Sequence, residues 1–163
     1  MKKIKIRGWN KKPRTMLRFI KIGDIFCFEC SDNKFAFGQI IGKSISGHIA
    51  IIFTLIKDSP EISGEEISGA SVLGSPVIIN SYGFFDRKSE GNWQIIGHEE
   101  DIDLSPYSHV AFRYGMPDGS KFGKVDITGK VYPKEFSPEE AKNWKPDSPM
   151  TDLGIKEYII ENL

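Results

Sequence analysis

The chain has few of the residues that build helices or disulfide-rich domains. Its 163 residues include only two cysteines, which is too few for a disulfide framework. Leucine and alanine are scarce, with six and five residues, whereas isoleucine occurs 23 times. Isoleucine is stiff about χ1 and suits a pleated surface, and few strong helix formers remain. The composition therefore favours a β-rich fold, and the unpaired thiols favour the reducing cytoplasm.

Long apolar segments are also absent. The longest apolar run, Ile49 to Phe53, has the length of a strand and not the roughly 18 residues of a membrane span. The N-terminus is basic, but no apolar segment of a secretory signal follows it. With 39% apolar and 27% charged residues, a chain of this length can bury a core of its own. We expect a soluble, cytoplasmic protein with a single domain over 1–163.

The net charge is zero, but the charge is distributed unevenly. Residues 1–21 hold nine Lys and Arg residues and no Asp or Glu. The remaining residues hold 13 Lys and Arg against 22 Asp and Glu, a net charge of −9. The electric field of such an uneven charge distribution steers association with charged partners. An acidic body behind a basic arm favours a basic protein as partner and disfavours nucleic acid as the primary ligand.

Turn signals and β-branched or aromatic runs predict the strands. They are expected at 17–22, 25–30, 35–42, 49–56, 77–79, 93–96, 110–114, 122–128 and 131–132. The tight turn at 31–34 joins two of them into a hairpin, and Gly38 predicts a bulge or bend. The apolar runs 40–41 and 49–53 indicate burial on both faces of a sheet. Residues 57–75 are expected to form a long connection with one helical turn.

The C-terminal end changes character. Ser137-Pro138-Glu139-Glu140 matches a capping box with proline at the first helical position, and 151–163 carries a partial apolar stripe. We therefore expect an α+β, predominantly β fold: a twisted antiparallel sheet, small barrel or sandwich with one or two short C-terminal helices. Its parts are a basic N-terminal arm (1–15), a β-rich core (16–132) and a helical C-terminal segment (137–163).

No catalytic or metal-binding constellation is complete in the sequence. Cys27 and Cys30 have C-x-x-C spacing, but no second ligand pair follows, and in a strand this odd offset places the thiols on opposite faces. The segment 119–125 lacks the spacing of a phosphate loop. The histidines are isolated from one another and from any nucleophile: His48, His98 and His109. We expect no enzyme activity, no metal and no cofactor.

Two segments are candidates for a contact surface. Aromatic residues in the loop 81–92 are potential interface anchors, although such residues are more often core. The acidic segment that follows 93–97 lacks the spacing of an EF-hand and is either a solvated loop or a docking site for a basic surface. The candidate interface residues are Tyr82, Phe84, Phe85, Glu99, Glu100, Asp101 and Asp103.

The predicted hairpin resembles a known family. Residues 22–29 (Ile-Gly-Asp-Ile-Phe-Cys-Phe-Glu) and 34–41 (Lys-Phe-Ala-Phe-Gly-Gln-Ile-Ile) are similar to the opening of the immunity protein 26 family. Those sequences begin with a Gly-Asp-x-Phe strand, a polar turn and a [Tyr/Phe]-Ala-[Tyr/Phe]-Gly-[Arg/Gln] strand. Trp93-x-Ile-Ile-Gly97 also resembles the family. Residues 1–15 and the C-terminal helix have no counterpart in the resemblance.

The resemblance implies a cytoplasmic immunity protein of a bacterial polymorphic-toxin system. Such proteins bind a cognate toxin domain, often a nuclease delivered by contact-dependent growth inhibition, and block its active site or its assembly. The family has no catalytic residues to carry over to this chain. Its shared residues are interpreted as fold determinants, so they do not locate the toxin interface.

Two other functions stay open at this point. A small β-barrel could bind nucleic acid through the basic residues of 2–21, with Trp9 stacking on a base. An enzyme of unrecognised class would require polar side chains that converge in a deep pocket.

Overall fold

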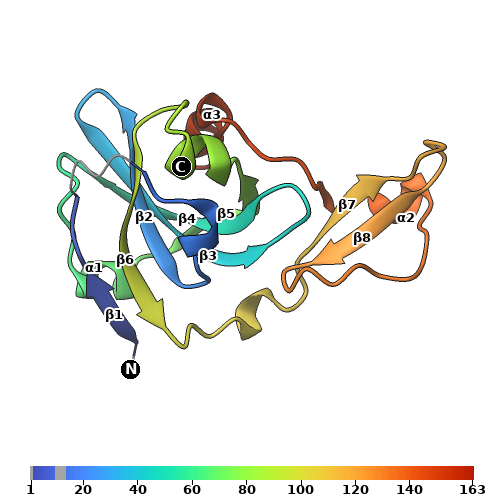
Figure 1. Ribbon diagram of the computed structural model, residues 1–163, viewed down its shortest axis with the longest axis horizontal. Coiled ribbons are helices and arrows are strands. Elements are labelled where there is room, and N and C mark those ends of the chain that lie inside the picture. Colours follow the sequence, from blue (N-terminus) through green and yellow to red (C-terminus); the bar gives the residue numbers. More distant parts are fainter. Residues whose placement is uncertain (1, 10–13) are drawn as a thin grey trace.

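The computed structural model describes residues 2–9 and 14–163 and is built on two sheets (Figure 1). The larger sheet is entirely antiparallel, with strand order β1-β6-β2-β3-β4-β5, and the smaller has the order β8-β7-β9. The strands of the larger sheet are β1 (Lys3–Ile6), β2 (Asp24–Ser31), β3 (Lys34–Lys43), β4 (His48–Lys57), β5 (Val72–Ile79) and β6 (Trp93–Glu100). Those of the smaller are β7 (Ala111–Gly115), β8 (Phe122–Asp126) and β9 (Lys145–Pro146).

Helices are short and few among the described residues. They are α1 (Gly64–Gly69), α2 (Pro138–Ala141), α3 (Asp152–Asn162) and the single turns η1 (Leu17–Phe19), η2 (Tyr82–Asp86) and η3 (Ser105–Tyr107). The fold is therefore α+β and predominantly β, as predicted, and its sheets do not close into a barrel. None of the helices in the described part of the chain has the length and hydropathy that a membrane span requires.

Both faces of the larger sheet are buried, because its strands carry apolar side chains in both directions. In β2, Phe26 and Phe28 point to one face, and Ile25 and Cys27 point to the other. The first face, called the α3 face here, is covered by η2 and α3. The opposite face, called the β7 face, is covered by α1, β7 and β8. In Figure 1 the smaller sheet and α2 project to one side of the larger sheet.

The core of the α3 face is aromatic. The Trp93 ring is stacked between Phe28 and Phe84, with centroid distances of 3.8 and 4.0 Å. Phe85 packs edge-on against the same indole at 6.1 Å. Such pairs stabilise a core beyond the area they bury. The family-like segment that begins at Trp93 is therefore a core determinant.

Gly38 lies between two irregularities in the pairing of β3 with β4, which confirms the predicted bulge or bend. A Cβ atom at this position would lie 2.4 Å from the Phe26 ring and 2.5 Å from the carbonyl oxygen of Ile51. Close approach of neighbouring atoms therefore requires glycine here.

Several predicted elements differ from the structure. Residues 17–22 contain the turn η1 instead of a strand, because the Leu17 amide donates to the distant Asp86 carboxylate and the Asp24 amide donates to the nearby Lys21 carbonyl oxygen. Strand β6 extends to Glu100, because β1 pairs with residues 97–100. Strand β8 ends at Asp126, and Val131 forms an isolated bridge. Helices α2 and α3 were predicted, and both have side-chain caps at the preceding residue.

The basic arm predicted at 1–15 is partly a strand. Residues 3–6 form β1 at the edge of the larger sheet, and residues 1 and 10–13 lie outside the described residues. The amides of Arg7 and Gly8 also donate to the carbonyl oxygen of Ile96, at 2.6 and 3.1 Å. The described beginning of the arm is thus attached to β6.

Candidate interaction surfaces on the two sides of β6

Strand β6 separates two charged hollows. It lies between β1 and β2, so that His98 pairs with Lys5 and with Asp24, and Glu99 pairs with Ile4. Successive side chains of a strand point to opposite faces. His98 accordingly lines a groove on the α3 face, and Glu99 lines a hollow on the β7 face.

Glu99 is a buried carboxylate, with 5% of its surface exposed. Its Oε1 accepts a hydrogen bond from Nε2 of Gln39 at 2.9 Å, and the same amide nitrogen lies 3.2 Å from the carbonyl oxygen of Gly23. Gly23 has a φ of +100°, and a Cβ atom there would lie 2.3 Å from the carbonyl oxygen of Glu99. Gly23 and Gln39, which belong to the family-like motifs, therefore hold the end of β6 in position.

The hollow around Glu99 combines an apolar floor with a mainly acidic rim. Its volume is about 500 Å³, and its floor includes Ile51, Phe53, Val72 and Ile102. All four predicted acidic residues line it, together with two lysines: Glu99, Glu100, Asp101, Asp103, Lys2 and Lys3. The structure thus brings the acidic candidates together. We call this site the acidic hollow.

The rim of the acidic hollow is exposed except at Glu99. Glu100, Asp101 and Asp103 all face solvent. Hydrogen bonds from Ser105 lower the pKa of Asp103, so this carboxylate stays charged in mildly acidic solution. Burial raises the pKa of Tyr107, and the negative charge of Glu99 adds to the effect. The hollow therefore presents fixed negative charge beside a neutral phenol.

The aromatic candidates do not belong to this hollow. Phe84 and Phe85 are 0% and 1% exposed and pack against Trp93, so they are core residues, the alternative that the sequence left open, and cannot serve as exposed anchors. The reason is that η2 turns both rings onto the α3 face. Tyr82 is 48% exposed and lies beside the Arg87 guanidinium, 5.8 Å from the ring centroid. It does not line the acidic hollow.

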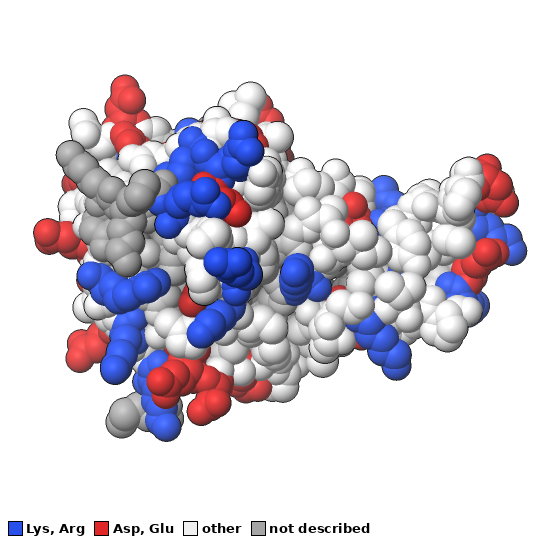
Figure 2. Space-filling model, viewed as in Figure 1, with Lys and Arg blue, Asp and Glu red and all other residues white. Residues whose placement is uncertain are grey.

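The groove on the opposite side of β6 is basic. It has a volume of about 670 Å³ and lies over β6, between β1 and residues 14–21. Its floor contains Phe85, Trp93 and Ile95, and five cations line it: Lys5, Arg7, Arg14, Lys21 and Lys88. Figure 2 shows Lys and Arg side chains over this side of the larger sheet, with acidic side chains gathered at its lower end. We call this site the basic groove.

A histidine and a carboxylate meet in the basic groove. His98 Nδ1 lies 2.8 Å from Asp24 Oδ1, and the Lys21 amide donates to Asp24 Oδ2 at 2.8 Å. Asp24 is 6% exposed, and it is the aspartate of the Gly-Asp-x-Phe motif. Sequence reasoning missed this groove. Its signal is the set of nine basic residues in 1–21, which the sequence assigns to an arm, with nucleic-acid binding as the alternative, and not to the lining of a groove.

The remaining candidates for chemistry stay apart. Cys27 packs on the β7 face and Cys30 on the α3 face, which confirms the predicted separation of the two thiols. Within residues 2–9 and 14–163, no three His, Cys, Asp or Glu side chains are grouped as metal ligands.

Comparisons with known proteins identify the family. The family model for immunity protein 26 matches residues 21–119, which is more than half of the chain. No curated protein and no solved structure matches. The matched segment runs from the residue before the family-like hairpin to the turn after β7. It contains the motif residues Gly23, Asp24 and Gln39, which hold His98 and Glu99 in place. The chain therefore belongs to the immunity protein 26 family.

Proposed function

We propose that this protein binds and neutralises a cognate bacterial toxin domain of the nuclease type in the cytoplasm of the cell that carries it. Membership of an immunity protein family supports the general role. The acidic hollow supports the type of partner, because its exposed carboxylates suit a basic surface. This hollow is the observation on which the proposal rests.

The composition of the acidic hollow supports its assignment as a protein interface. Interfaces have an apolar centre that excludes water and a polar rim that sets orientation. Here Ile51, Phe53 and Val72 form the centre, and the exposed carboxylates Glu100, Asp101 and Asp103 form the rim. Charge on the rim of an interface accelerates association and favours a partner of opposite sign.

A basic partner surface explains how binding would inhibit a nuclease. A nuclease holds phosphates with lysine and arginine side chains, so its substrate cleft is its most basic surface. A carboxylate rim that pairs with these cations competes directly with the nucleic acid. We therefore expect the toxin to be blocked by occlusion of its active site and the inhibition to be competitive with substrate.

The test is a charge reversal of the exposed rim. Glu100→Lys, Asp101→Lys and Asp103→Lys are combined, and buried Glu99 is left unchanged. The partner in this test is the variable C-terminal toxin domain that the proposal predicts to be encoded beside this protein. Calorimetry is expected to show at least 100-fold weaker binding, and the variant is expected to lose protection of cells that express the toxin.

The control carries the same change of charge elsewhere. Glu135→Lys, Glu157→Lys and Glu161→Lys alter three exposed residues outside the acidic hollow. This variant should keep its affinity within a few-fold. Equal affinity of the rim variant and the native protein would show that the toxin binds elsewhere, and unfolding curves would establish that both variants are folded.

A further inference from the structure

We propose that the basic groove binds single-stranded nucleic acid, with backbone phosphates on Lys5, Arg7 and Lys21 and a base stacked on Phe19. This site lies on the face of the larger sheet opposite the acidic hollow. It would act independently of toxin binding.

The walls of the basic groove are held in place by the fold. On one side, β1 pairs with β6, and the amide of Arg7 continues this attachment. On the other side, the amide of Thr15 donates to the Phe85 carbonyl oxygen at 2.7 Å, and that of Leu17 donates to Asp86 at 3.3 Å. The Lys21 amide, bound to Asp24, fixes the end of the same wall. A groove with fixed walls binds a ligand at a low entropic cost.

Two of the five cations in the groove already have partners. Arg14 forms an ion pair with Asp86 at 2.6 Å, and the Lys88 ammonium donates to the Trp93 carbonyl oxygen. Among the described residues, no ion pair involves the other three cations: Lys5, Arg7 and Lys21. These three are exposed and face the groove from both walls. Uncompensated cations on two sides of a groove fit an anion that runs between them.

The Asp24 carboxylate in the groove repels a bound anion only weakly. Asp24 is the acidic residue that lines the groove in the described part of the chain, and it is almost fully buried. One of its oxygens faces His98 and the other accepts from the Lys21 amide. The accessible charge of the groove is therefore positive.

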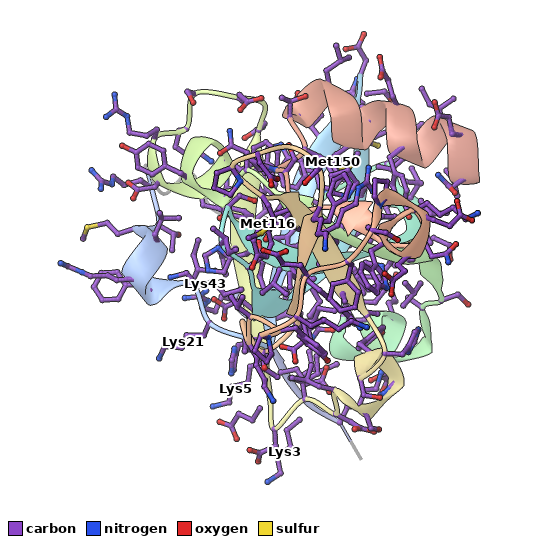
Figure 3. The ribbon with its side chains drawn as sticks, turned by 90° about the vertical axis from the view of Figure 1, so that its right-hand side faces the viewer. Lys3, Lys5, Lys21, Lys43, Met116 and Met150 are labelled. Atoms are coloured by element: carbon purple, nitrogen blue, oxygen red, sulfur yellow. The ribbon has the colours of Figure 1, made fainter. Side chains whose placement is uncertain are left out.

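The positive charge continues beyond the groove, which favours a long anion over a single phosphate or carboxylate. In Figure 3, Lys43, Lys21 and Lys5 lie in a row along one side of the molecule, and the row leads to Lys3, which lines the acidic hollow. These lysines come from β3, the wall before β2, and β1. Cations along an open groove are typical of proteins that follow a single-stranded backbone.

Phe19 favours a nucleic acid over an acidic peptide. Its ring lines the groove, is 53% exposed and has the Arg18 guanidinium 5.0 Å from its centroid. Exposed aromatic rings flanked by arginine stack on bases of any sequence. An acidic peptide offers no such planar group. A sequence-tolerant, salt-sensitive interaction with single strands is therefore expected.

The test uses the full-length protein and a fluorescent 12-nucleotide oligo-uridine, measured by anisotropy between about 50 and 200 mM salt. Lys5→Gln with Lys21→Gln should weaken binding at least tenfold and reduce the slope of log K against log salt by about 1.4, since each single-strand phosphate contact contributes about 0.7. Phe19→Ala should weaken binding about tenfold and leave this slope unchanged.

The matched control is Lys121→Gln with Lys130→Gln, which removes the same charge from exposed positions outside the groove. It should bind like the native protein. Three results would overturn the proposal: no binding of the oligonucleotide at 50 mM salt, equal loss in the control variant, or equally tight binding of a poly-glutamate peptide of the same charge. The last would assign the groove to acidic protein segments. Circular dichroism shows whether each variant is folded.

Discussion

The indole nitrogen of Trp93 donates a hydrogen bond to Oδ1 of Asp152 at 2.8 Å. This bond joins the centre of the aromatic core on β6 to the first residue of α3. The helix then packs Ile155 and Ile159, which are 0% and 5% exposed, onto the same face. Asp152 also lies at the positive end of the helix dipole and pairs with Lys156 at 2.8 Å. One carboxylate thus docks α3 and stabilises its N-terminus.

Replacement of this carboxylate is expected to loosen α3. Asp152→Ala leaves the buried indole N–H without an acceptor and removes the favourable charge at the helix N-terminus, which together cost about 1–3 kcal/mol. Urea denaturation measures this loss. Glu157→Ala, at an exposed position of the same helix, should change stability by less than about 0.5 kcal/mol. Similar unfolding midpoints for the two variants would contradict the role of Asp152.

Removal of the Gln39 amide is expected to destabilise the end of β6. Gln39→Leu leaves the buried Glu99 carboxylate without its side-chain donor, at a cost of about 1–3 kcal/mol. The double variant Gln39→Leu, Glu99→Leu removes both polar groups and should be more stable than Gln39→Leu alone. Together with Glu99→Leu and the native protein, these two variants form a double-mutant cycle in the free energy of unfolding. Strict additivity of the two changes would mean that the two side chains do not interact.

His48 is expected to make stability fall in acid. Burial, with a smaller effect from the charge of Lys43, lowers the pKa of His48 from 6.5 to about 4. The unfolded chain therefore takes up a proton below about pH 6.5, whereas the folded protein does so only near pH 4. Stability attributable to this group is fully present above pH 6.5 and is lost as the pH falls toward 4. The loss is on the order of 3 kcal/mol.

His48→Asn tests this expectation, since asparagine does not titrate and can replace the contact with the Ser81 hydroxyl. Its free energy of unfolding should fall less between pH 7.5 and pH 4.5 than that of the native protein. His109→Asn, at an exposed site, is the control and should follow the native curve. The same steep loss in all three proteins would assign the acid sensitivity to other groups.

The two cysteines are expected to be unreactive in the folded protein. Burial raises the pKa of Cys27 strongly, and it also raises the pKa of Cys30. Only the thiolate reacts, so labelling by a disulfide reagent at pH 7.5 should be slow in buffer and complete in denaturant. Mass spectrometry after mild oxidation should show no bond between the two, since their side chains lie on opposite faces. A rapid stoichiometric reaction would contradict this expectation.

Much of the fold could be predicted because local patterns and tertiary packing agree. The run of aromatic and β-branched residues from Ile25 to Phe28 predicts a strand, and burial of both faces follows from its apolar character. The capping box at Ser137 specifies a helix start without further context. At 17–22 the local pattern and the tertiary contacts disagree. An apolar segment suited to a strand forms a turn, because its amides bind distant Asp86 and nearby Asp24. No pattern within the segment reveals these partners.

The candidate site could be predicted only in part for a similar reason. The carboxylates at 99–103 are close in the sequence, so their grouping could be predicted, but the apolar floor of the acidic hollow and the burial of Glu99 could not. The burial of Phe84 and Phe85 depends on Trp93 and η2, and the basic groove depends on the pairing of β1 with β6. Both are products of long-range packing. The roles of Gly23, Asp24 and Gln39 could not be predicted, because these residues contact His98 and Glu99, which lie far from them in the sequence.

His98 and Glu99 are neighbours in β6, so the register of this strand determines which of the two side chains lies on which face of the sheet. A shift of one residue in a strand exchanges every side chain between the two faces. Such a shift in β6 would move the carboxylate into the basic groove and the imidazole into the acidic hollow. The irregularity in the pairing between Ile25 and Phe26 and the close contact of Gly23 with Glu99 hold the present register. An insertion or deletion of one residue before Gly97 would therefore place a buried carboxylate among the cations of the basic groove.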